Sequence, residues 1–554
     1  MTETAPADTA ALLRGIPSTM GDDHQLNTTT MFRHTARTFP EAEVVHRTLD
    51  GAWHRNTYAE EWERVNRAAG ALESIGVGPG DVVGVLDWNS RRHLELYWAI
   101  PGLAATMLQM NLRLAPEDVV YVAEHARAQY VCVDESLLPV AEAIAAKTDV
   151  VTDWIVLSDK PLSEIETGLE RVHHYEDLLA AAAPEYPFRQ VDERTAYSAC
   201  YTTGTTGRPK GVYYSHRAIY LHTMGIVGTL SITYDDVVMA ITPMFHAQTW
   251  GLAQAAVYAG TKLVLPGRFQ ADDMGVVAEA IVEEGVTVAN GAPSLFAPIL
   301  DHYRKRETPP DLSSARFVSG STEPPLSLMR GFSELTGADI IHGYGATETT
   351  PLVTANRTVK PSLRGWTNEQ KWDLKRSQGL PVPGIDFRVR GLDGQDLPHD
   401  GSSVGEVQMR GPWITESYHD QPDNAERFDE GWWKTGDVGT ITPEGYLKLT
   451  DRLKDVIKSG GEWISSIDME NAILDLPNVR EAAVIGVPDE KWQERPVAYV
   501  VAQDGAEVTR EDVAGVLEGR FAKWQMPDRV IVQDALPHTS VGKLDKKALR
   551  ADWE

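Results

Sequence analysis

The sequence predicts an α/β protein with a large N-terminal domain of layered sheets and helices, a β-rich subdomain, and a small mobile α+β C-terminal domain. Three observations support this prediction. The chain has 554 residues, which is too long for a single hydrophobic core. Helical and strand patterns alternate along most of it, as they do where helices cover a mainly parallel sheet. Beyond about residue 380 the strands become short and are separated by Gly, Pro and Asp, and a compact α+β pattern follows Arg452.

The first two-thirds of the chain carries the alternating patterns. Helices are expected over Tyr58–Ile75, Leu94–Leu103 and Met274–Glu284. Short runs rich in β-branched residues predict strands at Val82–Leu86, Tyr130–Val133, Val237–Ile241, Thr261–Leu265, Val286–Ala289, Ala315–Ser319 and Asp339–Ile341.

The last third predicts two further units. The β-rich subdomain is expected to contain strands at Phe387–Val389, Gly405–Arg410 and Tyr446–Leu449. The final module is expected to contain helices at Ser466–Leu476 and Arg510–Arg520, strands at Val479–Ile485 and Pro496–Ala502, and then a polar tail. We therefore expect a loosely held arm over residues 1–27, an N-terminal domain over 28–450, a hinge over 451–456 and a C-terminal domain over 457–554.

Composition excludes several classes of protein. The 80 acidic and 52 basic residues give a net charge of −28, which would repel nucleic acid and anionic lipid. No apolar run reaches the roughly 18 residues of a membrane span, and the N-terminus lacks the pattern of a signal peptide. Two cysteines, Cys132 and Cys200, exclude a disulfide framework and fit a reducing cytoplasm. We expect Cys200 to be structural, because small buried cysteines are far commoner than catalytic ones.

The stretch Tyr201–Lys210, YTTGTTGRPK, has the composition of a phosphate-binding loop. It is not a Walker A motif, because Pro209 stands where the second glycine belongs and Gly211 follows Lys210. The next residues, Val212–Tyr214, favour a strand rather than a helix. We therefore expect a loop between two strands, lined by threonine hydroxyls and backbone N–H groups. An ordinary polar hairpin turn would have a similar composition.

Four further segments carry chemically useful residues. His342–Pro351, HGYGATETTP, follows a strand and offers an aromatic ring, a hydroxyl and a carboxylate, which suit a purine, a phosphate and Mg²⁺. Lys434–Asp437, KTGD, places an acid where it could accept hydrogen bonds from ribose. Asp451–Ser466, DRLKDVIKSGGEWISS, combines charges with two glycines, and Pro537–Lys543, PHTSVGK, places a lysine in an exposed tail.

Taken together and in this order, the segments resemble the adenylate-forming superfamily of acyl- and aryl-CoA ligases, peptide-synthetase adenylation domains and luciferases. The resemblance covers residues 28–550. The segments PMFHAQTW (Pro243–Trp250), RGPWI (Arg410–Ile414), KWQERP (Lys491–Pro496) and FAKWQ (Phe521–Gln525) look like medium- and long-chain fatty acyl-CoA synthetases. The resemblance implies ATP, Mg²⁺ and CoA as cofactors. A carboxylate would attack the α-phosphorus of ATP to give an acyl-adenylate and pyrophosphate, and the thiol of CoA would then displace AMP.

The resemblance also implies a set of nucleotide contacts. Tyr344 would face adenine, Thr347 the α-phosphate, and Asp437 the ribose hydroxyls with Arg452 beside it. The β- and γ-phosphates would be held by Thr202, Thr203, Gly204, Thr205, Thr206, Gly207 and Lys210, with Thr203 and Glu348 as the metal candidates. The remaining nucleotide-side candidates are Gly320, Ser321, Glu323, Pro324, His342, Gly343 and Gly345.

Two further groups concern the steps of the reaction. Lys543 would bridge the acyl carboxylate and the α-phosphate during adenylation. Rotation of the C-terminal domain about Lys454 would then remove Lys543 and bring the segment Ser459–Trp463, with Gly460, Gly461 and Trp463, to the thiol tunnel. A flexible lysine suits a group that must arrive and leave.

The acid pocket is expected to contain Trp250, Asn290, Gly291 and Ala346, with His246 beside the substrate carboxylate. His246 and Trp250 could equally be an ordinary aromatic pair in the core. Glu323-Pro324 and Ser321 depart from the common fatty acyl-CoA synthetase pattern, and Ser321 with Asn290 could add polarity to the pocket. Since unpaired polar groups against an alkyl chain cost about 1–3 kcal/mol each, a short- or medium-chain or an aryl acid is expected.

The same motifs leave other functions open. An ATP-dependent diazotase, which activates nitrite for coupling to an aryl amine, would keep every ATP contact. Luciferase-like and carrier-protein-loading variants share the scaffold, and a non-catalytic binding protein is the remaining class. A homodimer is suggested only by the resemblance to fatty acyl-CoA synthetases.

Overall fold

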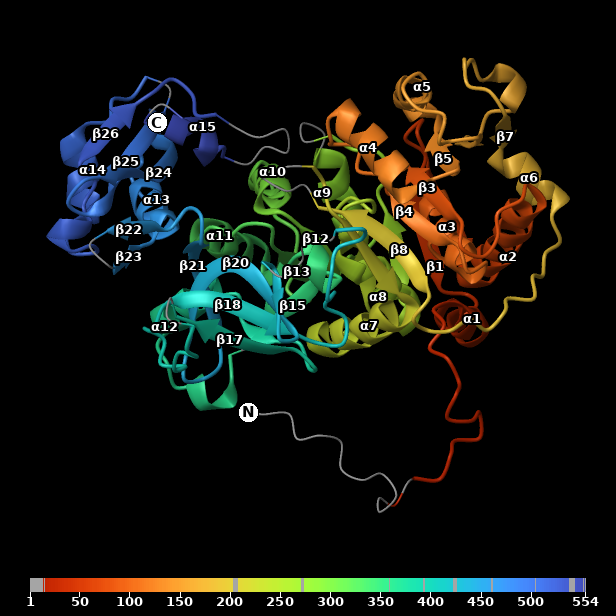
Figure 1. Cartoon of the computed structure of the whole chain (residues 1–554), viewed down its shortest axis with the longest axis horizontal. Helices are drawn as coiled ribbons and strands as arrows, with labels where there is room; N and C mark the ends of the chain where they lie inside the picture. The colour runs from red at the N-terminus through yellow and green to blue at the C-terminus, as the bar shows by residue number, and fades with distance from the viewer. Residues whose placement is uncertain are drawn as a thin grey trace.

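The computed structural model describes residues 13, 15–202, 208–270, 274–357, 359–391, 394–421, 426–459, 462–503, 505–537, 544–551 and 553. Within these ranges the strands form four sheets. Two large sheets with their helices make the main body, a β-rich subdomain lies beside them, and the C-terminal module stands apart at the left of Figure 1. This is the predicted α/β architecture.

The seven-stranded sheet has the order β7-β6-β5-β3-β4-β8-β9, and all its neighbours are parallel except β8 and β9. Its strands are β3 (Val82–Leu86), β4 (Thr106–Gln109), β5 (Tyr130–Asp134), β6 (Asp153–Leu157), β7 (Val172–His174), β8 (Ala196–Tyr201) and β9 (Gly211–Ser215). Helix α2 (Tyr58–Ser74) precedes β3, and the helices between the strands are α3 (Arg91–Gly102), α4 (Pro116–Ala126), α5 (Leu138–Ala145) and α6 (Tyr175–Ala181).

The nine-stranded sheet has the order β16-β15-β14-β13-β12-β10-β11-β1-β2, with a parallel centre and antiparallel edges. Its strands are β1 (Glu43–Arg47), β2 (Trp53–Thr57), β10 (Val237–Met239), β11 (Lys262–Leu265), β12 (Val288–Gly291), β13 (Arg316–Ser319), β14 (Asp339–Gly345), β15 (Leu352–Asn356) and β16 (Leu380–Pro381). Its helices are α1 (Thr29–Thr38), α7 (His216–Leu230), α8 (Leu252–Ala259), α9 (Met274–Glu283), α10 (Pro293–Arg304), α11 (Leu326–Thr336) and α12 (Asn368–Arg376).

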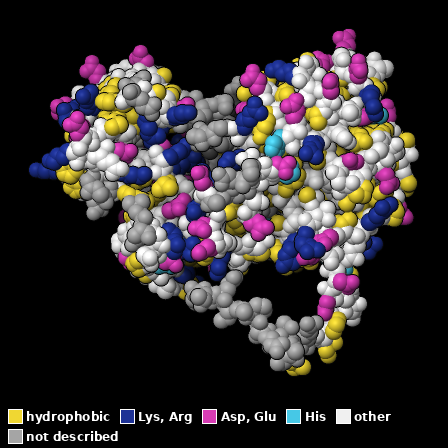
Figure 2. Space-filling model, in the orientation of Figure 1, with side chains coloured by type: hydrophobic (Ala, Val, Ile, Leu, Met, Phe, Trp, Pro, Cys, Tyr) yellow, Lys and Arg dark blue, Asp and Glu magenta, His cyan; other side chains and the backbone are white. Residues whose placement is uncertain are grey.

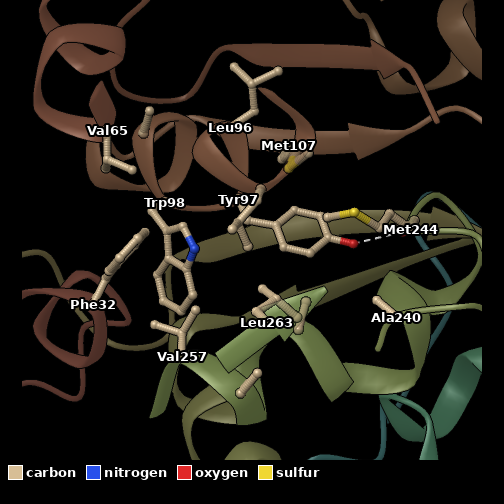
Figure 3. Packing of buried hydrophobic residues seen from close by; sticks show 14 of the residues in the cluster. Phe32, Val65, Leu96, Tyr97, Trp98, Met107, Ala240, Met244, Val257 and Leu263 are labelled. Atoms are coloured by element: carbon tan, nitrogen blue, oxygen red, sulfur yellow. Dashed lines mark hydrogen bonds between the residues drawn. The ribbon is translucent and has the colours of Figure 1, made fainter. Parts of the chain in front are cut away.

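Helices α1, α3 and α8 pack together between the two large sheets. Figure 3 shows Phe32 of α1, Trp98 of α3 and Val257 of α8 meeting there, with 5.4 Å between the ring centroids of Phe32 and Trp98. These side chains are fully buried, and each contributes about 1.5–3 kcal/mol by leaving water. The hydroxyl of the neighbouring Tyr97 donates to the carbonyl oxygen of Met244 at 2.8 Å. The packing therefore fixes the loop that follows β10.

The β-rich subdomain and the C-terminal module complete the fold. The antiparallel subdomain contains β17 (Asp386–Arg390), β18 (Gly405–Arg410), β19 (Phe428–Asp429), β20 (Trp432–Ile441) and β21 (Leu447–Arg452). The module contains β22 (Ile457–Ser459), β23 (Glu462–Ile464), α13 (Ser466–Leu474), β24 (Val479–Asp489), β25 (Gln493–Ala502), α14 (Arg510–Leu517), β26 (Arg529–Val532) and α15 (Lys546–Ala551). Figure 2 shows acidic and basic side chains interspersed over the visible face of both parts. None of the described helices is long and apolar enough to cross a membrane.

The sequence predicts a polar tail after residue 520. This prediction is wrong, because strand β26 and helix α15 lie in that part of the chain. Strand β26 pairs in parallel with β25, and Leu549 of α15 is buried in a cluster with Val487 and Tyr499. The Trp553 indole donates to the Tyr499 hydroxyl at 2.7 Å. The apolar residues that pack here are few and widely spaced, so they show neither a helical nor a strand periodicity in the sequence.

The expected loose arm does not extend to Asn27. The described residues ahead of α1 lead away from the main body in Figure 1, but the side-chain amide of Asn27 exchanges two hydrogen bonds with the backbone of Val191, at 2.8 and 2.9 Å. The backbone of Leu26 also donates to Glu193 at 2.9 Å. The last residues before α1 are therefore fixed to the segment that leads into β8.

Candidate active site

The loop that follows β10 lies at a reversal of strand order in the nine-stranded sheet. From β10 the chain crosses first to β11 on one side and then to β12 on the other. Ligands of open α/β sheets bind at the carboxyl ends of strands at such a reversal. His246 and Trp250 lie on the loop after β10, and Asn290 and Gly291 form the end of β12. The fold therefore brings the predicted acid-pocket residues to this edge.

Four consecutive residues of this loop, Ala247–Trp250, have left-handed backbone conformations, with φ between 44° and 56°. Each costs about 1–2 kcal/mol for a residue that is not glycine, so surrounding contacts must hold the turn. Asn290 Nδ2 donates to the Thr249 carbonyl at 2.7 Å. Gln248 Nε2 donates to Ser198 Oγ at 2.7 Å and its Oε1 accepts from Gln254 at 2.8 Å.

The hydrogen bonds of Asn290 alter the expectation that this residue adds polarity to the acid pocket. The Asn290 amide also accepts from the backbone N–H of Thr242 at 3.3 Å, so its donor and acceptor are both occupied. Asn290 supports the turn and does not present an unpaired polar group to an acyl chain. The cost expected for such a group therefore does not apply at this residue.

The turn places the Trp250 ring against the end of β13. A Cβ atom on Gly320 would lie 3.4 Å from Cη2 of Trp250 and 2.7 Å from the carbonyl oxygen of Gly343. Only glycine allows this close approach. His246 is half-buried at the start of the turn, and its backbone N–H donates to Pro243 at 2.9 Å. Trp250, Gly320 and Gly343 therefore lie close together at the sheet edge, and His246 lies at the start of the turn.

Tyr344, Asp437 and Arg452 come together from three strands. The Tyr344 hydroxyl at the end of β14 donates to Asp437 Oδ2 of β20 at 2.6 Å. Arg452 Nε at the end of β21 lies 3.8 Å from Asp437 Oδ1. Burial raises the pKa of the Tyr344 phenol and the Asp437 carboxylate raises it further, so the phenol stays protonated and remains a donor.

Thr347 and Glu348 lie in a short 3₁₀ turn, Thr347–Thr349, directly after β14. The Tyr214 hydroxyl donates to the Thr347 carbonyl at 2.6 Å, and Tyr418 donates to Glu348 Oε1 at 2.5 Å. Burial raises the pKa of the Glu348 carboxyl, against the lowering effect of the Tyr418 hydrogen bond. A cation beside Glu348 would offset this desolvation.

The donor set around Glu348 fits Mg²⁺ rather than a metal held by protein alone. Among the residues that the structure describes, no group of three or more His, Cys, Asp or Glu side chains could hold a metal ion. Magnesium commonly uses one or two carboxylates and completes its shell with water and substrate phosphates. Glu348 would hold it in this way, and Thr203, the other metal candidate, lies outside the described residues.

The strand–loop–strand prediction for the threonine-rich segment is confirmed at both ends. Strands β8 and β9 are antiparallel, and the backbone N–H of Thr202 donates to Lys210 O at 2.9 Å. Glycine at position 211 avoids a close contact, because a Cβ there would lie 2.9 Å from Cζ of the Tyr201 ring. Lys210 Nζ lies 4.9 Å from the centroid of the Tyr418 ring. The predicted residues that lie outside the described part are Thr203, Gly204, Thr205, Thr206 and Gly207.

Glu323 forms an ion pair that the sequence did not predict. Its Oε1 lies 2.7 Å from Arg376 Nε at the end of α12, and burial raises the pKa of this carboxyl while Arg376 opposes the shift. The Arg376 carbonyl is also 2.8 Å from His342 Nδ1. Ser321 has a positive φ of 72°, and Pro324 follows Glu323. Arg376 lies 53 residues from Glu323, so no local pattern could have shown this contact.

Lys454 lies between contacts to the two parts of the chain. On one side, Leu453 N–H donates to Gly436 O of β20 at 2.9 Å. On the other, Asp455 Oδ1 accepts from Arg550 of α15 at 2.8 Å. Trp463 lies opposite Lys458 in the pairing of β22 with β23. Gly460, Gly461 and Lys543 lie outside the described residues.

Both cysteines are buried and free. Burial raises the pKa of the Cys200 thiol to about 12, so it is protonated at neutral pH and a poor nucleophile. This agrees with the structural role expected for Cys200. Ala346, the last acid-pocket candidate, is half-buried and packs with Tyr344 on the core of the β-rich subdomain.

Comparison with known proteins identifies the family. Residues 32–419 match the family model described as AMP-binding enzyme, and residues 468–543 match the AMP-binding enzyme C-terminal domain. The chain belongs to the AMP-binding enzyme family. This confirms the resemblance seen in the sequence, and the AMP-binding fold accounts for the body and the C-terminal module.

Three similar proteins are named as CoA ligases for three different acids. The long-chain-fatty-acid–CoA ligase of Thermus thermophilus is 40% identical over 98% of both chains. The 3-methylmercaptopropionyl-CoA ligase of Ruegeria lacuscaerulensis is 37% identical, over 94% of this chain and 96% of that one. The crystal structure of the anthranilate CoA ligase AuaEII with anthranoyl-AMP superposes with a TM-score of 0.81 at 25% identity, covering 95% and 97% of the two chains.

Proposed function

We propose that the protein is an AMP-forming acid–CoA ligase, which adenylates a carboxylic acid with ATP and transfers the acyl group to CoA. One observation supports the proposal. The Tyr344 hydroxyl donates to Asp437, and Tyr418 contacts both Glu348 and Lys210, so the fold brings together groups that would bind a nucleoside, a metal ion and phosphates. Acyl–CoA ligases among the near relatives support it.

The chain's own groups would divide the first step between them. Tyr344 and Asp437 would bind the nucleoside, Lys210 would restrain the departing phosphates, and His246 would lie beside the acid. Mg²⁺ held at Glu348 would supply charge neutralisation at the phosphate oxygens. Lys543 would join the acyl carboxylate to the α-phosphate during adenylation. The protein then acts mainly by positioning reactants and stabilising charge.

The second step would use the C-terminal module in another orientation. The contacts on either side of Lys454 support a pivot there, since its two neighbours are bonded to different parts of the chain. Rotation of the module would withdraw Lys543 and bring the segment that contains Trp463 to the path of the CoA thiol. This is a hinge-type rearrangement.

We propose a short- or medium-chain acid or an aryl acid as the substrate. The relatives named above take a long-chain acid, a short thioether acid and an aryl acid, so the family alone does not select one. In this chain the Trp250 ring lies against Gly320, where it would shorten an acyl tunnel, and the small Ala346 would leave room for a ring.

The location and assembly of the protein are also proposals. The free buried thiols of Cys132 and Cys200 fit a reducing compartment such as the cytoplasm. A homodimer follows from the resemblance to fatty acyl-CoA synthetases. Light scattering on the purified protein would test it, and a mass of one chain would contradict it.

One experiment tests the proposed reaction. Purified protein is incubated with ATP, Mg²⁺ and a panel of alkyl and aryl acids, with and without CoA, while AMP, pyrophosphate and thioester are followed. AMP and thioester are expected in equal amounts with at least one acid of the proposed class. If AMP forms only with nitrite plus an aryl amine, and no acid yields a thioester, the protein is a diazotase and the proposal is wrong.

A further inference from the structure

The segment Trp413–His419, here called the strap, contacts both catalytic segments of the main body. The Trp413 carbonyl accepts from Thr350 Oγ1 at 2.5 Å, and Thr415 N–H donates to the Glu348 carbonyl at 2.9 Å. At its other end His419 N–H donates to Gly211 O at 2.9 Å. The strap therefore joins the turn that carries Glu348 to the strand that follows the phosphate loop.

Tyr418 of the strap contacts two opposite charges. Its hydroxyl donates to Glu348 Oε1 at 2.5 Å, and its ring centroid is 4.9 Å from Lys210 Nζ. The side chain is 6% exposed and packs edge-on against Phe428, with centroids 5.4 Å apart. The phenol cannot move without changing the surroundings of both charged groups.

Each contact fixes a group that would meet the triphosphate. A hydrogen bond to a charged acceptor is stronger than one between neutral groups, so the Tyr418 hydroxyl holds Glu348 Oε1 in a fixed place. A cation over a tyrosine face is attracted by the ring quadrupole, so the ring limits where the flexible Lys210 ammonium can lie. One side chain thereby sets the spacing between the carboxylate and the ammonium.

We propose that Tyr418 is a positioning residue that holds Glu348 and Lys210 at the separation required by the Mg²⁺-bound phosphates of ATP. The proposal rests on the proposed function, which gives Glu348 its metal and Lys210 its phosphates. The hydroxyl serves the metal side and the ring serves the phosphate side. The other role open to a buried tyrosine is packing against Phe428 alone.

The variant Tyr418→Phe separates these roles, because it keeps the ring and removes only the hydroxyl. Tyr303→Phe is the matched control: Tyr303 is fully buried between α10 and α9, and its hydroxyl donates to the Ala278 carbonyl at 2.8 Å. ATP binding to each protein is measured by isothermal titration calorimetry with Mg²⁺ and, separately, with EDTA. Calorimetry reports binding without turnover.

For Tyr418→Phe we expect MgATP affinity to fall about tenfold, equivalent to ~1.4 kcal/mol, with metal-free ATP affinity changed less than about twofold. Tyr418→Leu, which also removes the ring, should weaken both forms of ATP. Tyr303→Phe should match the wild type. Equal losses with and without Mg²⁺ in Tyr418→Phe, or no loss at all, would overturn the proposal.

The outcome is distinguishable from a failure of the proposed function. If the wild type binds MgATP but forms no AMP with any acid, the proposed reaction fails while the binding comparison still reports on Tyr418. In an active enzyme, Tyr418→Phe should slow adenylation and raise the Mg²⁺ concentration needed for half-maximal rate. Thioester formation from pre-made acyl-adenylate should change less than about twofold, and an equal loss in both half-reactions would contradict a role at the triphosphate.

Discussion

The hydroxyl of Tyr344 donates a 2.6 Å hydrogen bond to Oδ2 of Asp437, a residue 93 positions further along the chain. The bond joins the nine-stranded sheet to the β-rich subdomain, since Tyr344 ends β14 and Asp437 lies in β20. The proposed nucleoside site therefore lies at a junction between two units of the fold. Each unit contributes one of the two groups that the nucleoside would meet.

Asp437→Asn should weaken ATP binding about tenfold or more, because the amide lacks the charge that strengthens hydrogen bonds from the ribose hydroxyls. Asparagine keeps an acceptor oxygen for Tyr344, so the fold should be retained. Calorimetric titration with ATP and with 2′-deoxy-ATP checks the assignment. The wild type should prefer ATP, and the variant should lose most of that preference. A variant that still discriminates as well as the wild type would show that Asp437 does not contact the 2′-hydroxyl.

Local sequence patterns predicted most elements but not their ends at the site. Strands β3 and β18 have the bounds expected from sequence, because apolar and β-branched runs end at turn residues. Strands β12 and β14 continue through Asn290–Gly291 and His342–Gly345, where Asn290 and three glycines have low β-propensity. Pairing with the neighbouring strands extends them there, and tertiary context of this kind overrides local preference.

Sequence motifs predicted some residues of the candidate site and missed others, for a related reason. Motifs mark residues that are close in sequence, such as Tyr344, Thr347 and Glu348. Tyr418 and Arg376 reach their partners across 70 and 53 residues, so their roles appear only when the chain is folded. The left-handed turn before Gly251 could not be predicted either, because Ala247–Trp250 contains no glycine that would indicate positive φ.

Lys543→Ala should abolish adenylation while leaving thioester formation from pre-made acyl-adenylate largely intact. The lysine is expected to stabilise charge only in the first half-reaction, before the C-terminal module turns about Lys454. Pyrophosphate release and thioester formation, measured in separate assays, check this. Lys547→Ala, on the nearby helix α15, is the matched control and should support both half-reactions. Equal loss of both in Lys543→Ala would contradict a mechanism with two orientations.

Trp250→Ala should move substrate preference toward longer acids. The ring lies against Gly320 at the end of β13, so its removal would open space that a longer alkyl chain can fill. We expect the ratio of kcat/KM for dodecanoate to that for butyrate to rise about tenfold or more. Trp372→Ala is a control, since this half-buried tryptophan of α12 lies beside Arg330 of α11, with 5.4 Å between the guanidinium carbon and the ring centroid. An unchanged ratio in Trp250→Ala would mean that the ring does not limit the acid pocket.

Glu61 offers a stability prediction outside the active site. It is fully buried in the first turn of α2, and neither carboxylate oxygen has a hydrogen-bond partner among the residues that the structure describes. Burial raises the pKa of Glu61, the Glu95 carboxylate raises it further, and the Arg91 and Arg64 guanidinium groups oppose the shift. The folded protein thus keeps a proton on Glu61 that the unfolded chain releases above a pKa of about 4.3.

Because the folded state binds the extra proton, wild-type stability should fall as pH rises from that unfolded value through the raised folded one. Glutamine at position 61 carries no titrating proton. The Tm of Glu61→Gln should therefore exceed the wild-type Tm by more near pH 8 than near pH 5.5, two values chosen roughly to lie within this pH range. Glu63→Gln, on the same helix with a half-exposed side chain, is the control and should show little pH-dependent difference. An advantage for Glu61→Gln that is constant with pH, or greater at the acidic end, would show that Glu61 is ionised in the folded protein and that a charge partner stabilises it.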